Sequence, residues 1–195
     1  MKDKETSKPI KFNGLSLLEK IILTLNCYFF FATGMCMPIV TITLISMVNS
    51  SIIAQAQTVG SILSALIVYI FAQYTMRQLH FKLFKVTTII VDLLILFLAI
   101  CYPSVILYWM FYVVAKIITQ IDNTSEGTIM LNFFDTHKRR VDFDITERKY
   151  TVIFSVIGSI IAIFTSIQFN IAMTILISSF CFLNIKDIYM SKYLP

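Results

Sequence analysis

Five apolar stretches, separated by polar or charged stretches, dominate the chain, and the last is long enough for two helices. A helix needs about 20 apolar residues to cross a bilayer, and most of the stretches approach that length. The pattern predicts an all-α, polytopic membrane protein in which six transmembrane helices form one bundle, in a single domain of residues 1–195. The expected spans lie at about 23–48, 53–75, 86–101, 106–123, 150–167 and 171–185.

The last two spans come from one continuous apolar stretch, Tyr150 to Ile185. As a single helix it would be about 54 Å long, whereas the hydrocarbon core of a bilayer is about 30 Å thick. The stretch must therefore fold back, and Gln168, Phe169 and Asn170 form the expected turn. The polar residues 124–149 before it are expected to form a long cytoplasmic loop.

Composition supports a membrane protein and argues against a soluble one. The chain is 57% hydrophobic and 14% charged, with a mean hydropathy of +0.81, outside the range of soluble domains. Its net charge of +5 does not indicate a nucleic-acid partner, because the basic residues form short clusters between apolar stretches. The expected partner is the lipid bilayer.

The distribution of basic residues predicts an orientation. If six spans place both termini on one side, every lysine and arginine except Lys116 falls on that side. Cytoplasmic segments carry an excess of such residues. We therefore expect a multi-pass protein of the cell (plasma) membrane with both termini cytoplasmic and residues 1–20 as a cytoplasmic tail.

Cysteine and histidine positions do not suggest catalysis. The four cysteines lie within or at the ends of expected spans, without metal-binding spacing, and His80 and His137 fall in loops. No nucleophile, zinc or phosphate-binding motif is found. We expect no enzyme, no metal and no cofactor.

Polar residues at membrane depth are the candidate site, because they are costly there and normally face a bundle interior or a wet cavity. Asp92 and Lys116 lie at nearly the same depth in consecutive spans, so they are predicted to pair, either as an inert ion pair or as part of a solute or ion site. Lys116, Gln120, Asn123 and Gly127 follow helical spacing and form one polar stripe. Asp122 and Glu126 form a second stripe near the cytoplasmic mouth. The candidate substrate or ion pathway is Asp92, Lys116, Gln120, Asp122, Asn123 and Glu126.

This arrangement resembles the N-terminal half of a major facilitator superfamily transporter. The shared features are six spans, a short basic loop after the second, a long charged loop after the fourth, and termini inside. That family builds each half from two inverted three-helix repeats, in which spans two and five correspond. Here those spans share the sequences around Gly60 and Gly158, Val-Gly-Ser-Ile-Leu and Ile-Gly-Ser-Ile-Ile.

The family's loop between spans two and three usually reads Gly-x-Leu-Ala-Asp-Arg-x-Gly-Arg-Arg. In this chain Ala72, Met76 and Leu79 replace the first glycine, the aspartate and the second glycine. Arg77 stays in register, while His80 and Lys82 keep some of the basic character. The resemblance implies that Arg77, His80 and Lys82 are the remnant of a gating loop.

The resemblance implies a half-size permease of a bacterial membrane, for uptake or efflux of a small solute or drug. Such a half would act as a homodimer or beside a second six-helix half. Three alternatives stay open: a non-transporting accessory or bacteriocin-immunity protein, a remnant of a full-length transporter, and the substrate-binding subunit of an energy-coupling-factor vitamin importer. Span one is bulkier than the helix packing of those importer subunits requires.

Overall fold

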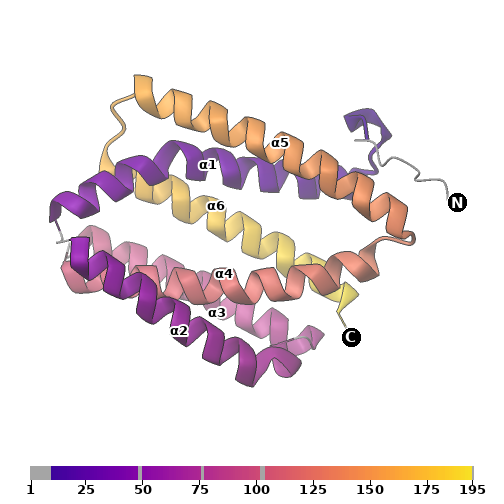
Figure 1. The fold of residues 1–195 in the computed structure, drawn as a ribbon, viewed down its shortest axis with the longest axis horizontal. Coiled ribbons are helices and arrows are strands. Elements are labelled where there is room, and N and C mark those ends of the chain that lie inside the picture. The colour runs from indigo at the N-terminus through magenta and orange to yellow at the C-terminus, as the bar shows by residue number, and fades with distance from the viewer. Residues whose placement is uncertain (1–9, 48–49, 76, 102–103, 195) are drawn as a thin grey trace, which may run out of the picture.

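A computed structural model describes residues 10–47, 50–75, 77–101 and 104–194, and they form an all-α bundle, as predicted (Figure 1). This part of the chain contains six α-helices and a short 3-10 helix near each end. The α-helices are α1 (Leu17–Met47), α2 (Ser50–Thr75), α3 (Gln78–Cys101), α4 (Val105–Phe133), α5 (His137–Phe164) and α6 (Phe169–Met190); the 3-10 helices are η1 (Phe12–Gly14) and η2 (Ser191–Tyr193).

The helices pack mainly in non-sequential pairs. α1 lies against α5 and α6, α2 lies against α4, and α3 lies against α6. Figure 1 shows α1, α5 and α6 on one side of the view and α2, α3 and α4 on the other. The described ends of the chain meet near the α4–α5 connection, because Arg139 donates to the Gly14 carbonyl (3.0 Å) and Asn132 to the Tyr193 carbonyl (2.7 Å).

Side-chain caps explain where three helices begin. Ser16 and Glu19 form a reciprocal capping box at the start of α1, with N–H···O distances of 2.6 and 3.3 Å. The hydroxyls of Ser104 and Thr136 accept backbone N–H groups of α4 and α5, each at 3.3 Å. These bonds satisfy N–H groups that the first helical turn leaves free.

The predicted long loop at 124–149 is wrong, because only residues 134–136 separate α4 from α5. The polar residues continue both helices, and apolar residues on one side of them, among them Ile129, Met130 and Phe143, are buried. That spacing is the one an amphipathic helix needs. The basic loop after α2 is shorter than predicted for the same reason, since α3 already begins at Gln78.

Part of the predicted N-terminal tail packs on α5. Residues 1–9 lie outside the described residues. The Ile10 N–H donates to the Thr146 hydroxyl at 2.8 Å, and Leu15 is buried. Arg139 binds Glu19 through two N–H···O bonds of 2.9 and 2.7 Å. The start of the described chain is therefore held by the first turns of α5.

The backbones of α1 and α5 approach closely at two glycines. A Cβ at Gly158 would overlap the Phe31 carbonyl oxygen, and one at Gly34 would overlap the Ser155 carbonyl oxygen. In the α2–α4 pair, a Cβ at Gly60 would lie 3.2 Å from the Cβ of Lys116. Glycine permits this backbone approach because it has no side chain.

Two helices in the described chain are long and apolar enough to cross a membrane: Leu17–Thr43 and Phe169–Tyr193. The apolar part of α2, Ala54–Ile70, is shorter. A turn between the last two helices is confirmed, but it lies at residues 165–168. Of the predicted turn residues only Gln168 belongs to it, because Phe169 and Asn170 already begin α6.

Candidate functional site

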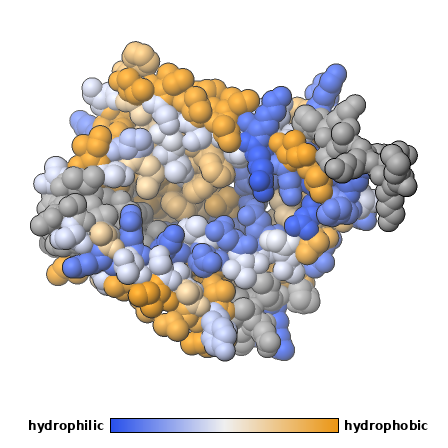
Figure 2. All heavy atoms as spheres, in the orientation of Figure 1, coloured by the Kyte–Doolittle hydropathy of each residue, from blue (hydrophilic) through white to orange (hydrophobic). Residues whose placement is uncertain are grey.

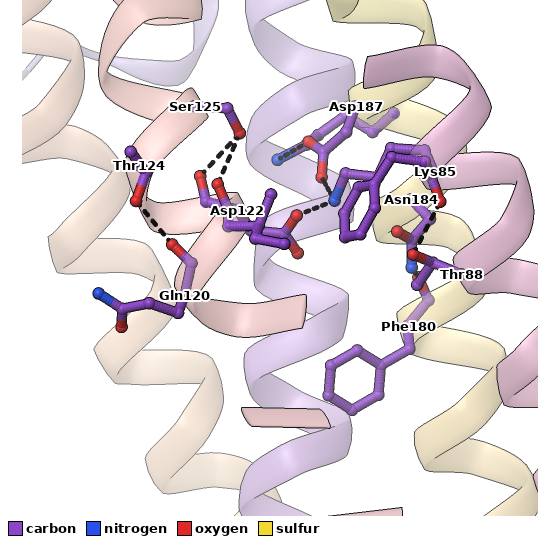
Figure 3. Close-up of polar contacts among 12 residues, drawn as sticks. Lys85, Thr88, Gln120, Asp122, Thr124, Ser125, Phe180, Asn184 and Asp187 are labelled. Carbon is purple, nitrogen blue, oxygen red and sulfur yellow. Dashed lines mark hydrogen bonds and ion pairs between the residues drawn. The ribbon is translucent and has the colours of Figure 1, made fainter. Parts of the chain in front are cut away.

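Lys85 lies at the centre of the buried polar groups. Its helix, α3, has one buried face formed by Phe81, Lys85, Thr88 and Asp92, and the Lys85 side chain has no exposed surface. Its ammonium pairs with Asp122 of α4 and lies 2.9 Å from the Asp187 carboxylate of α6 (Figure 3). One cation therefore connects three helices.

The contacts continue from Asp187 to α1 and α5. The Lys186 ammonium lies 3.3 Å from Asp187 and donates to the Asn26 side-chain oxygen at 2.9 Å. The Asn26 amide nitrogen in turn donates to Glu147 at 2.5 Å. We call these six residues the charge network: Lys85, Asp122, Asp187, Lys186, Asn26 and Glu147.

The charge network joins α1, α3, α4, α5 and α6. Buried charges are stable only when other groups replace the lost water, and removing one partner of a buried pair typically costs about 3–5 kcal/mol. The network has three carboxylates and two ammonium groups, so its formal charge is negative when all are ionised. Burial raises the pKa of the Glu147 carboxyl, as does Glu126 nearby, while Lys186 and Asn26 partly offset the shift.

A cavity of about 220 Å³ adjoins the charge network. Its polar lining comes from α1, α4, α5 and α6 and includes Asn26, Asp122, Glu147, Lys186 and Asp187. The remaining lining is largely apolar. We call this space the inner cavity. A concave space with a mostly apolar wall and a few converging polar groups is the usual form of a small-molecule site.

Three of the predicted pathway residues line the inner cavity. Asp122 belongs to the charge network, and Asn123 and Glu126 line the cavity beside it. Gln120 and Lys116 are exposed on another side of α4. In Figure 3 the Gln120 amide points away from the Lys85 pair.

The predicted Asp92–Lys116 pair is wrong. Asp92 lies on the buried face of α3, and its Oδ2 has no hydrogen-bond partner in the described residues. Lys116 starts from the side of α4 that packs on Gly60 of α2. Asp92 and Lys116 lie at a similar height in the bundle but face different helices. The cation that pairs with Asp122 of α4 is Lys85.

The predicted gating-loop residues do not form a separate cluster. Arg77 lies exposed between α2 and α3, whereas His80 and Lys82 belong to the first turns of α3 and are half-buried. Met76 lies outside the described residues. The sequence does not predict Lys85 as a site residue, because an expected span of 86–101 leaves Lys85 in the basic loop before it. The helical spacing of Phe81, Lys85, Thr88 and Asp92 was the signal that could have placed Lys85 on a buried face.

In the described residues, no group of three His, Cys, Asp or Glu side chains could hold a metal ion. Cys27 and Cys36 are buried free thiols on α1. No family model, curated protein or solved structure matches the chain. The resemblance to major facilitator transporters therefore rests on the sequence features alone.

Proposed function

We propose that this chain is the half-size counterpart of a major facilitator permease, with six membrane-crossing helices and a solute site in the inner cavity. The observation that carries the proposal is the charge network beside that cavity. In a chain of this hydropathy, a bundle that served only as an anchor would have no reason to bury two lysines and three carboxylates.

The helix pairing supports an inverted three-helix repeat. If α1, α2 and α3 correspond to α4, α5 and α6, the α1–α5 pair corresponds to the α4–α2 pair. Gly158 packs against α1 in the first pair, and Gly60 packs against α4 in the second. These glycines come from the two similar sequence segments, so a glycine contact joins the two proposed repeats at each of two corresponding helix pairs.

The charges support a cytoplasmic location for both termini. The α2–α3 and α4–α5 connections lie at the same end of the bundle as the described chain ends (Figure 1). Arg77 and Lys138 lie near these connections, and Lys11 and Lys192 lie near the chain ends. Lys85 and Lys186 are buried inside the bundle, so they do not count as basic residues at its cytoplasmic end.

The open face of the bundle supports a dimer or a second six-helix half. In Figure 2 this face is hollowed between α1 and α4, with hydrophilic residues gathered along the α4 side. Lys116, Gln120 and Asn123 are exposed on α4. A partner on this face would enclose the hollow and shield these polar groups from lipid.

Two measurements test the membrane arrangement. Alkaline phosphatase fused after Ser51 or Gln168 is expected to be active, and fused after Arg77, Phe134 or Lys192 inactive. Activity after Phe134 would contradict six spans with cytoplasmic termini. The mass in mild detergent is expected to be that of a dimer, or of a complex with another six-helix chain.

Exchange assays test transport. Proteoliposomes loaded with ethidium, lactose or phenylalanine are expected to lose one of these compounds faster than loaded vesicles without the protein. Lys85→Met is expected to slow that loss. Equal retention of all three, together with a strictly monomeric mass, would contradict a carrier.

An exposed pair of basic residues in the fourth turn of α5 favours a second candidate, a non-transporting membrane accessory protein. Arg148 and Lys149 are exposed there. In that case Arg148→Glu with Lys149→Glu would abolish the phenotype of the gene, whereas Lys85→Met would preserve it in correctly folded protein.

A further inference from the structure

A second cavity, of about 260 Å³, continues the inner cavity toward the surface of the bundle. We call it the outer cavity. The two cavities share four lining residues, Asn123, Glu126, Met130 and Glu147. The two cavities are therefore neighbours, with α4 and α5 contributing to the wall of both.

The inner cavity offers room for one large apolar group. Phe29 and Phe30 of α1 and Phe180 of α6 line it, together with Ile22, Ile129 and Leu183. Transfer of an apolar side chain from water into such a space is favourable in proportion to the area removed from water. The polar groups at its edge would orient the rest of the ligand.

Two carboxylates lie in the wall shared by the cavities. Glu147 is half-buried and accepts a hydrogen bond from Asn26. Glu126 is exposed on α4 and has no ion pair within 4 Å among the described residues. The Lys186 ammonium interacts electrostatically with Glu126 and Glu147, but it also interacts with Asp187, so one cation is shared among three carboxylates. A ligand ammonium at this position would bind between two carboxylates.

Two arginines line only the outer cavity. Arg140 and Arg148 lie two helical turns apart on α5, and neither forms an ion pair within 4 Å with another described residue. A guanidinium presents a fork of N–H donors that matches a carboxylate. Asp144 lies between them and sets a limit on the net positive charge of this region.

We propose that the two cavities together bind an α-amino acid with a large apolar side chain. The side chain occupies the inner cavity, the ammonium lies between Glu126 and Glu147, and the carboxylate faces Arg140 and Arg148. The order of the binding groups fits this ligand. Its ammonium and carboxylate are attached to the same carbon, and the two glutamates and two arginines that would bind them line the same outer cavity. This inference rests on the proposed solute site, but binding does not require transport.

Calorimetry on the purified protein in mild detergent tests the assignment with four ligands: phenylalanine, N-acetylphenylalanine, phenylalanine amide and glycine. Phenylalanine is expected to bind. N-Acetylphenylalanine lacks the ammonium, phenylalanine amide lacks the carboxylate, and glycine lacks the side chain. Each of these three ligands is expected to bind about tenfold more weakly or worse, since each loses one of the three contacts. Binding of the amide equal to that of phenylalanine would overturn the arginine contact, and equal binding of the acetylated ligand would overturn the glutamate contact.

Variants locate the site. Glu147→Gln and Arg140→Gln are each expected to weaken phenylalanine binding about tenfold, whereas Lys149→Gln, an exposed neighbour that does not line either cavity, is expected to leave it unchanged. Absence of phenylalanine binding to the folded wild type would overturn the inference. Binding without exchange in proteoliposomes would instead preserve it and count against the carrier function. Exchange of ethidium or lactose without amino-acid binding would support the carrier function and overturn the amino-acid site.

Discussion

The Lys85 ammonium lies 2.9 Å from the Asp187 carboxylate and thereby links α3 to α6 inside the bundle. Because α6 also packs on α1, and α1 on α5, this link connects the two groups of helices seen on either side of Figure 1. The inner cavity lies beside it. The ion pair thus stabilises the bundle at the place where the solute site is proposed.

Replacement of Lys85 tests this stabilisation. Lys85→Met leaves Asp122 and Asp187 without their shared cation, so it is expected to lower stability in detergent by about 3–5 kcal/mol. For a chain of this length that corresponds to roughly 2–4 °C in Tm for each kcal/mol. Lys82→Met, in the preceding turn of α3 and half-buried, is the matched control and should change Tm little. A small effect at Lys85 would mean that the pair contributes no net stability.

Asp92 and Lys116 are expected to act independently. Asp92→Asn replaces a buried carboxylate that lacks a partner at Oδ2, so it is expected to preserve or raise Tm. Lys116→Met changes an exposed side chain and should have a small effect. The double mutant should show the sum of the single changes, because the two side chains do not touch. A double mutant much more stable than that sum would indicate direct pairing.

The glycine contact between α1 and α5 is expected to tolerate no side chain. Gly158→Ala places a Cβ against the Phe31 carbonyl, and overpacking of this kind costs about 1–3 kcal/mol. Gly127→Ala on α4 is the control, because a Cβ there meets nothing within 4 Å. Alanine favours helix over glycine, so that control should be neutral or stabilising. Equal Tm values for both variants would contradict the contact.

The pH dependence of stability should include Glu147. Its pKa is raised in the folded protein, chiefly by burial, so the stabilising contribution is complete below its ordinary pKa of about 4.5 and is lost as the pH rises through the raised pKa. Glu147→Gln cannot ionise and avoids this loss. The variant should match the wild type near pH 4 and exceed its Tm near pH 8. A larger advantage at pH 4 than at pH 8 would contradict a raised pKa.

Apolar stretches predicted the helices of this protein, because a long run of such residues cannot form an exposed loop. The ends were predicted less well. Residues 124–149 were assigned to a loop from their charge, but helix formation depends on spacing and propensity, and charged residues are good helix formers. Lys85 and Lys186 were placed outside the bundle for the same reason.

The partners of the buried charges could not be predicted from depth alone. Asp92 and Lys116 lie at similar heights, yet the direction in which a helix faces depends on its packing against distant helices. Asn26 and Glu147 meet because α1 lies against α5, and nothing in the sequence between them specifies that pairing. Asp122, Asn123 and Glu126 of α4 line the inner cavity, and their role in a substrate or ion pathway stays a prediction.

The pairing of α1 with α5 also affects the order in which the chain can be assembled during synthesis. Asn26 and Glu147 are 121 residues apart, and Glu19 and Arg139 are 120 apart. Until the ribosome has made α5, the first helix has polar side chains without their partners. The packing of α1 is therefore completed only after α5 has been synthesised, and a chain truncated before residue 137 is expected to be more sensitive to proteolysis than the whole chain.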